Sequence, residues 1–428
     1  MKLFLNTTYV FIGLHIIYWR TGRKKQRRNI LMDCPKVLTK KELRKMQVTN
    51  TNLQSKNSEN NLNPENLRFF NTAEAPYRFA SLNNEARDYL NKNGFVALKN
   101  VLSEVELAEA EKNLWKFLSQ CGMKQDDIST WKENIFPGCL LSGLVWNFGA
   151  GQSDFQWYIR TRPSVLDAFV KLWEVNSYED LLVSMDGLAI FRPWKQRTQW
   201  KTVGGWYHID QNVIMKPKLC SYQGYVTLYD QNQYTGGTTV IPTTQQDIVK
   251  TMGPYCSRPS DYIEVPHHCK AIFSREKWLI CLEKGDLFIW DSRLVHCSSP
   301  AIDILPDQQT QKSNDQSQTL ETETKEDDNA SKPKLLRAAS MVTFAPKSLL
   351  NRYNKGQIIQ ERVNAFLNNQ TCSHWPTQCK ILGGRSTGKP KQLPQNDLKK
   401  LSRVGKSLIG VDILKECDDK WKDYNLGD

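Results

Sequence analysis

Apolar residues follow two different rhythms along the chain, one typical of helices and the other of short strands. Before about residue 181 the helical rhythm dominates. Leu82–Lys92 carries apolar residues at helical spacing and stops before Gly94, which suits the left-handed residue that ends many helices. Phe95–Leu98 then predicts a short strand. Ser103 and Glu106 form the capping-box pattern that begins a second amphipathic helix.

A further helix is predicted to open at Arg162-Pro163, because proline suits the first helical position. From about Leu181 to Phe344 the apolar runs become short and are separated by Gly, Pro and Asp. This rhythm is typical of an antiparallel sandwich or barrel of the jelly-roll type. Helices precede strands, so the predicted fold class is α+β. The predicted strands are 189–191, 225–228, 239–241, 278–281, 287–290 and 341–344.

Polar composition divides the remainder of the chain into segments. We expect residues 1–31 to be a signal-anchor or a basic arm and residues 32–66 to be a disordered linker. A folded domain should span 67–383 and contain a polar, disordered insert at 303–334. Residues 384–428 should form a peripheral C-terminal tail.

The net charge of +13 resides mostly in the N-terminal segment, where residues 1–45 carry 12 Lys and Arg against two acidic residues. The folded part is therefore close to neutral, and we do not expect nucleic acid as a partner. Residues 3–19 are mostly apolar but short for a membrane span. They predict either membrane contact, with the basic side facing the cytosol, or a disordered arm.

The 11 cysteines show no paired spacing, which favours a reduced, intracellular protein that is cytoplasmic or anchored facing the cytosol. The chain ends without the S-K-L peroxisomal signal.

Candidate chemistry centres on the pair His208 and Asp210. On a strand, residues i and i+2 point to the same face, so an imidazole and a carboxylate would converge there. This supplies two ligands of a 2-His-1-carboxylate iron site. His296, expected at the end of the strand that begins near residue 287, is the candidate third ligand. His267-His268, in an irregular stretch, is the alternative source.

A co-substrate such as 2-oxoglutarate would need a cation for its distal carboxylate, and arginine binds carboxylates through two hydrogen bonds. Arg337 opens the strand after the polar insert and is the first candidate. Ser298, two residues beyond His296, could add a hydrogen bond. Arg293 is a weaker candidate for this role, because we expect it to form an ion pair with Asp286 or Asp291.

The sequence resembles the phytanoyl-CoA dioxygenase family over about Leu82 to Pro346. The resemblance begins with residues 89–104, a helix, a strand and a helix, and includes Trp157–Arg160 and Leu182–Gly187. Its most specific segments are Gly205–Asn212, Gln223–Leu228 with Gly236–Pro242, and Gly285–His296.

The resemblance implies a double-stranded β-helix core of cupin-like jelly-roll type, flanked by N-terminal helices. It also implies Fe(II), 2-oxoglutarate and O2, with release of succinate and CO2. By position, His208, Asp210 and His296 match the iron ligands and catalytic residues, and Arg337 matches the 2-oxoglutarate arginine. The sequence departs from the family in the insert, which moves Arg337 far from His296.

The expected function is therefore a dioxygenase that hydroxylates an unactivated C–H bond of a small-molecule or lipid-like substrate. The alternative is a non-catalytic jelly-roll module of the same family that only binds partners. A nucleic-acid-modifying oxygenase is a third hypothesis, which the near-neutral folded part disfavours.

Overall fold

The computed structural model describes residues 67–139, 142–302, 334–351, 354–382 and 395–417, together with 421, 422, 424 and 426. The expectations for residues 1–66, and for most of the polar insert, lie outside the described residues.

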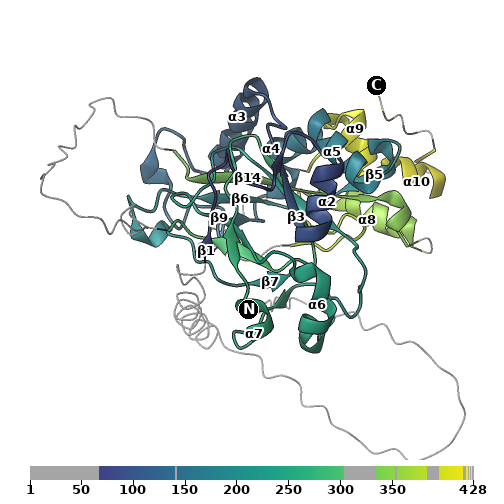
Figure 1. The fold of residues 1–428 in the computed structure, drawn as a ribbon. Helices are drawn as coiled ribbons and strands as arrows, with labels where there is room; N and C mark the ends of the chain where they lie inside the picture. Colours follow the sequence, from purple (N-terminus) through teal and green to yellow (C-terminus); the bar gives the residue numbers. More distant parts are fainter. Residues whose placement is uncertain are drawn as a thin grey trace, which may run out of the picture. The chain divides into compact units, whose positions relative to one another are not determined.

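Two mainly antiparallel sheets form the centre of the fold (Figure 1). The first has six strands, in the order β1 (Leu67–Arg68), β11 (Lys277–Leu279), β9 (Gly237–Val240), β13 (His296–Ser299), β7 (His208–Ile209) and β10 (Ile263–Glu264). The second has eight strands: β2 (Arg78–Phe79), β3 (Phe95–Leu98), β12 (Leu287–Asp291), β8 (Tyr222–Thr227), β14 (Arg337–Pro346), β6 (Leu188–Phe191) and β4 (Leu144–Val145), with β5 (Leu181–Val183) paired to β14.

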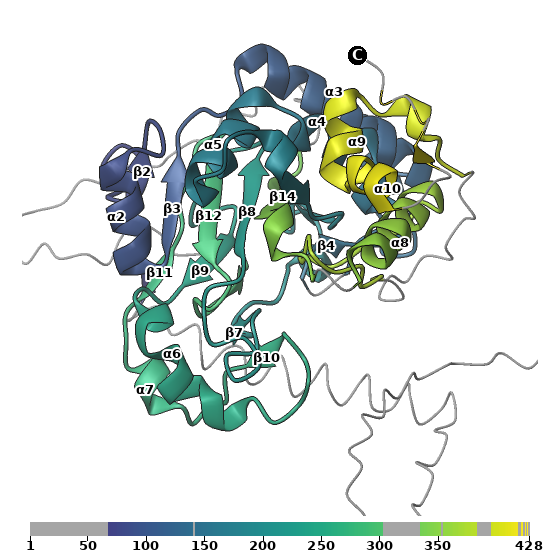
Figure 2. The ribbon, with the colours of Figure 1, turned by 90° about the vertical axis from the view of Figure 1, so that its right-hand side faces the viewer.

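Helices flank both sheets, and they occur after the strands as well as before them. Helices α6 and α7 lie at the end of the fold that holds β7 and β10, whereas α8, α9 and α10 gather near β14 (Figure 2). The fold is thus α+β, as predicted. The helices are α2 (Asn84–Asn93), α3 (Glu104–Cys121), α4 (Asp154–Arg160), α5 (Pro163–Trp173), α6 (Thr244–Met252), α7 (Lys270–Phe273), α8 (Lys355–Leu367), α9 (Arg403–Ile409) and α10 (Val411–Cys417).

The local signals at the start of the folded part correspond to the elements that form. Helix α2 ends at Gly94, whose φ of 88° is left-handed and therefore suits glycine. Strand β3 spans the predicted residues. Helix α3 begins with the full capping box, in which Ser103 and Glu106 each accept a hydrogen bond from the other's backbone N–H.

One strand expectation is wrong, and the difference bears on the site. His296 does not end the strand that begins at Leu287, because a turn intervenes. The Leu294 N–H donates to the Asp291 carbonyl over 2.8 Å, and the Arg293 N–H donates to the Asp291 carboxylate over 2.8 Å. The chain then enters the other sheet, where His296 is the first residue of β13.

An apolar core fills the space between the sheets, and aromatic rings supply much of it. Phe288 and Trp290 of β12 pack with Tyr225 of β8 and Val240 of β9. A second cluster joins Tyr207 and neighbouring residues to α6 and α7. Tyr207 and Ile209, the residues before and after His208, both belong to this second cluster, so packing holds the segment that carries His208.

The C-terminal residues 395–417, which fall in the segment expected as a tail, form α9 and α10. Leu408 and Ile409 are fully buried in the larger core cluster. Arg362 of α8, also fully buried, donates hydrogen bonds to the carbonyls of Ile409 (2.9 Å) and Val183 (2.7 Å). One side chain therefore joins α8, α9 and β5. None of the helices in the described ranges combines the length and apolar character that a membrane span requires.

Candidate metal centre

His208, Asp210 and His296 meet at two adjacent inner strands of the six-stranded sheet, β7 and β13. His208 begins β7 and His296 begins β13, and the two are direct partners in the antiparallel register. Their ring centroids lie 4.3 Å apart. Asp210 follows β7, and its N–H donates to the Ser292 carbonyl over 3.0 Å. The backbone thus fixes the origin of all three side chains.

The ligand atoms of the three side chains converge on one point. The Nε2 atom of His208 lies 3.5 Å from Oδ1 of Asp210, and the Nε2 atom of His296 lies 3.3 Å from Oδ2. One ligand atom from each residue lies within 4.8 Å of the others. Two imidazole nitrogens and one carboxylate are the donor set of a non-haem iron site, so these residues fit Fe(II).

Backbone carbonyls determine which ring nitrogens are available. His208 Nδ1 lies 3.0 Å from the Trp206 carbonyl, and His296 Nδ1 lies 3.0 Å from the Leu294 carbonyl. A carbonyl only accepts, so each Nδ1 carries the proton and donates it. The lone pairs are left on Nε2, the atoms that face Asp210. Hydrogen bonds of this kind, from Nδ1 to a carbonyl, orient metal-binding histidines in many proteins.

All three side chains of the centre are largely buried, and that of Asp210 is the most exposed of them. The side chains of His208, Asp210 and His296 are 6%, 13% and 7% exposed. Burial opposes ionisation of Asp210. When the histidines also carry a proton on Nε2, the charge of His208 and the hydrogen bonds from His208 and His296 outweigh burial and hold the pKa of Asp210 well below the ordinary value. Burial and the neighbouring His208 lower the pKa of His296. An ionised carboxylate beside a neutral imidazole is the state that a metal requires.

Aromatic rings and an amide surround the three ligands. Trp206 stacks on His208 at 4.8 Å, and Tyr262 lies 4.7 Å from the same imidazole. Trp290 lies 5.2 Å from His296. The Gln223 Nε2 donates to Oδ2 of Asp210 over 2.9 Å. Gln223 was not predicted as a site residue, because the predicted strand began only at Tyr225. In the structure both residues lie on β8, two apart, and therefore share one face.

The alternative histidines do not join the centre. His267 and His268 are exposed on the segment between β10 and α7. Across the described ranges, the one cluster of His, Cys, Asp and Glu with metal-binding geometry is formed by His208, Asp210 and His296.

Arg337 is a deeply buried cation between the two sheets. It is 2% exposed, and its Nη2 donates to the Thr238 hydroxyl over 3.3 Å. Its guanidinium lies 5.0 Å from the Phe191 ring and 4.8 Å from the Tyr225 ring. Its Nε is buried without a hydrogen-bond partner, and no carboxylate of the described residues pairs with it. Burial lowers the pKa of this guanidinium.

Thr238 connects Arg337 to the strand of the third ligand. Ser298 is the register partner of Thr238, and His296 is the partner of Val240. Residues two apart on β13 share a face, so Ser298 lies on the side of that strand from which His296 projects. The polar insert therefore does not separate Arg337 from the centre in space.

The other arginine pairs as the sequence analysis expected. Arg293 binds the carboxylate of Asp291 with a shortest distance of 2.6 Å. Asp286, the other acid considered, is fully buried and pairs with Arg78 over 2.8 Å.

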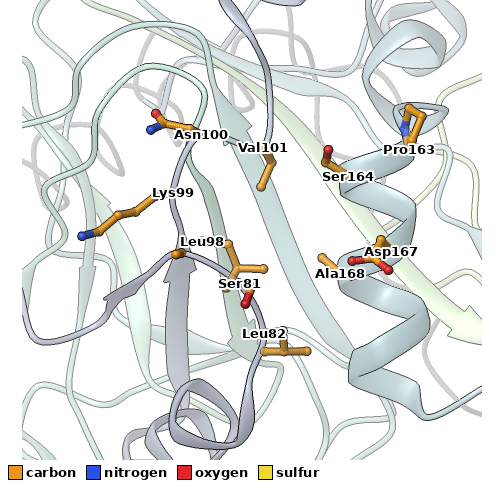
Figure 3. Close-up of a pocket in the computed structure, with 11 residues that line it drawn as sticks. Ser81, Leu82, Leu98, Lys99, Asn100, Val101, Pro163, Ser164, Asp167 and Ala168 are labelled. Carbon is orange, nitrogen blue, oxygen red and sulfur yellow. The ribbon is translucent and has the colours of Figure 1, made fainter.

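A cavity of about 360 Å³ lies elsewhere in the fold (Figure 3). It is lined by the residues around Ser81, the end of β3 and the first turns of α5, and it shares no residue with the metal centre.

The chain shares partial similarity with known proteins. No family model matches the sequence. The chain is 28% identical over 228 residues to the Ava biosynthesis cluster protein O of Aspergillus versicolor, which covers 50% of this chain and 71% of that protein.

Solved structures similar to this chain include enzymes that use iron or 2-oxoglutarate. SnoN, described as a non-heme alpha ketoglutarate dependent epimerase from nogalamycin biosynthesis, is 13% identical with a TM-score of 0.36, covering 61% of this chain and 80% of its own. EctD from S. alaskensis with bound Fe is 12% identical with a TM-score of 0.40, covering 68% and 83%. SnoK, an alpha ketoglutarate dependent carbocyclase, is 13% identical with a TM-score of 0.37, covering 64% and 86%. The reactions named differ, so they do not select one for this chain.

Proposed function

We propose that this protein is an Fe(II)- and 2-oxoglutarate-dependent dioxygenase that hydroxylates an unactivated C–H bond of a small or lipid-like substrate. The observation that carries the proposal is the combination of two features. Three candidate ligands converge in the 2-His-1-carboxylate pattern. A buried arginine on β14, with no acidic partner among the described residues, donates to Thr238 on β9, the strand next to β13.

When bound, Fe(II) and 2-oxoglutarate supply the oxidising chemistry, with O2 consumed and succinate and CO2 released. The protein contributes geometry. His208, Asp210 and His296 would hold the metal by one face and leave the remaining positions open. The carbonyls behind each Nδ1 keep both Nε2 lone pairs directed inward, and Gln223 keeps the carboxylate in place.

Arg337 would bind the distal carboxylate of 2-oxoglutarate. A buried guanidinium without a counter-ion is unfavourable, and a carboxylate ligand would relieve that cost through charge-assisted hydrogen bonds. Its unpartnered Nε is a donor available for this purpose. Phe191 and Tyr225 exclude water from the guanidinium, which strengthens the interaction. Ser298 is the candidate for an additional hydrogen bond from the β13 side.

The two facing sheets are consistent with a double-stranded β-helix core, and the resemblance to the phytanoyl-CoA dioxygenase family supports the same cofactor set.

The proposal is tested by adding Fe(II) and 2-oxoglutarate to the full-length protein without oxygen. We expect a visible absorption band from charge transfer between the metal and the bound keto acid. His208→Ala should abolish the band, because the metal loses one of its three protein ligands. His268→Ala is the matched control, since that exposed histidine lies outside the centre, and its band should equal that of the wild type.

The absence of a band in the wild type, or an undiminished band in His208→Ala, would contradict the proposal and favour a non-catalytic binding module. With the band established, release of succinate in the presence of O2 and candidate substrates measures the reaction itself.

A further inference from the structure

Two further titratable side chains lie beside the metal centre, on segments far apart in the sequence. Asp186 lies in the loop between β5 and β6, and His374 follows α8. Asp186, His374 and Asp210 interact electrostatically: His374 favours the ionised form of both acids, whereas Asp210 disfavours ionisation of Asp186. The segment of His374 and the loop of Asp186 are also in backbone contact, through Cys372 and Met185.

His374 has an unused polar atom. Its Nε2 is buried and makes no hydrogen bond, although the residue as a whole is partly exposed. Its ring packs against Trp375, with centroids 5.2 Å apart. A buried nitrogen without a hydrogen-bond partner is unfavourable. A ligand atom that forms a hydrogen bond with it would remove this cost.

The segment that carries His374 is held firmly on one side. The Cys372 N–H donates to the Met185 carbonyl over 2.8 Å, and the Gly151 N–H donates to the Thr371 hydroxyl over 2.9 Å. Arg362 donates to the Pro376 carbonyl over 2.8 Å. The segment is thus tied to the Asp186 loop and to α8.

On the other side the same segment contacts the chain that follows Asp210. The Lys216 ammonium lies 3.8 Å from the Trp375 ring centroid and pairs with Asp261 over 2.8 Å. The short segment that carries His374 is therefore held between the Asp186 loop and the segment after Asp210.

The Asp186 loop is fixed from behind by α4. Gln156 Nε2 donates to the Asp186 carbonyl over 3.0 Å, and Arg160 Nη2 donates to the same carbonyl over 2.6 Å. Gln156 and Arg160 are both fully buried. Because these bonds engage only the backbone, the carboxylate stays available. One of its oxygens accepts from the Gly187 N–H over 2.6 Å, and the other accepts no hydrogen bond from the described residues.

We propose that Asp186 and His374 form a polar subsite that binds a hydroxyl or amide group of the substrate next to the metal-binding Asp210. The inference rests on the proposed function and gives a substrate class to that site. A carboxylate accepts one hydrogen bond, and an imidazole either donates or accepts another. Hydroxyl and amide groups offer both a donor and an acceptor, which alkyl groups lack. Gln156 and Arg160 act as positioning residues for this subsite.

The competing interpretation is a purely structural role. Buried polar groups that serve structure alone are satisfied by the protein, as the guanidinium of Arg362 is by main-chain carbonyls. The His374 Nε2 is not satisfied, and neither are Ser373 Oγ and Trp375 Nε1 beside it. His374 differs from these two neighbours because its ring also interacts electrostatically with Asp186 and Asp210.

The experiment uses the full-length protein loaded with Zn(II), which is redox-inert, and with 2-oxoglutarate. The probes are 2-phenylethanol, N-benzylacetamide and ethylbenzene, whose affinities are measured by ligand-observed NMR. We expect at least one of the two polar probes to bind about tenfold tighter than ethylbenzene, the size of one neutral hydrogen bond of about 1.4 kcal/mol. The comparison between the alcohol and the amide identifies the preferred group.

Asp186→Asn and His374→Phe should remove this preference while leaving 2-oxoglutarate binding intact, and His268→Phe should leave both unchanged. Equal binding of all three probes, no binding of any probe, or a preference that survives in His374→Phe would overturn the inference. If Asp186→Asn does not fold, His374→Phe alone decides. Failure of the proposed function is separate, since it would appear as a missing Fe(II)·2-oxoglutarate band in the wild type.

Discussion

Arg337 on β14 donates a hydrogen bond of 3.3 Å to the hydroxyl of Thr238 on β9, so one side chain joins the two sheets. Thr238 is in turn the register partner of Ser298 on the strand that begins with His296. The candidate co-substrate arginine and a candidate metal ligand are thereby linked through a single intermediate strand.

Replacing Arg337 by Met should weaken 2-oxoglutarate binding by about 10- to 100-fold, because a hydrogen bond to a charged group contributes roughly 1.5–3 kcal/mol. The measurement is an anaerobic titration of the Fe(II)-loaded protein that follows the charge-transfer band. Arg337→Lys should give an intermediate affinity, since it keeps the charge but not the two-pronged geometry.

Arg337→Met should leave the unfolding free energy of the ligand-free protein unchanged or higher, because it removes a buried charge without a counter-ion. A variant that unfolds far more easily and still binds 2-oxoglutarate normally would argue that Arg337 is structural.

Replacing Gln223 by Leu should lower the affinity for Fe(II) by about 10- to 100-fold, the usual effect of losing an outer partner of a metal ligand. Gln223 donates to Oδ2 of Asp210, and without it the carboxylate is free to turn. Competition with a chelator of known affinity measures the change. Gln357→Leu, on the exposed face of α8, is the control and should bind Fe(II) as the wild type does. Equal affinities in the two variants would refute the role of Gln223.

Replacing Arg78 by Met should reduce the unfolding free energy by about 3–5 kcal/mol, since the fully buried Asp286 would lose its partner. The loss should appear in urea denaturation as a lower midpoint. Arg68→Met is the matched control: its pair with Glu276 spans 3.7 Å between exposed side chains and should matter by less than about 1 kcal/mol. Similar losses in both variants would contradict this assignment.

Replacing Gly151 by Ala should destabilise the protein by about 1–3 kcal/mol, the usual effect of overpacking. A methyl group at this position would press against the carbonyls of Met185 and Asp186 and against Thr371. Gly253→Ala would meet only the end of the exposed Ile214 side chain and should be nearly neutral. Thermal unfolding of the two variants tests the difference, and equal melting temperatures would show that the Asp186 loop can move aside.

The sequence predicted those elements whose signals are local. The helix that ends at Gly94 and the capping box at Ser103 depend on neighbouring residues, and both form as expected. Strands of two residues, such as β4 and β10, carry no periodicity of their own and exist only because a partner strand binds them. The turn before His296 was missed because the side chain of Asp291, and not a Gly or Pro, creates it.

In the candidate site, too, only the part that depends on neighbouring residues could be predicted from the sequence. The spacing of His208 and Asp210 is local, and the structure brings His296 to them through strand pairing. Asp186 and His374 could not be inferred, because only tertiary contacts between the β5–β6 loop and the segment after α8 bring them together. No spacing rule relates residues so far apart.

Strand β14 has a consequence for the order in which the protein can fold. It pairs with β8, β6 and β5, all of which precede it by long stretches of chain. During synthesis, all three candidate metal ligands leave the ribosome before β14 does. Until residue 346 emerges, β6 and β8 expose unpaired edges to which other chains can add. Closing such distant pairs is slow. Chains truncated before Arg337 should therefore aggregate, even though they contain the whole ligand triad.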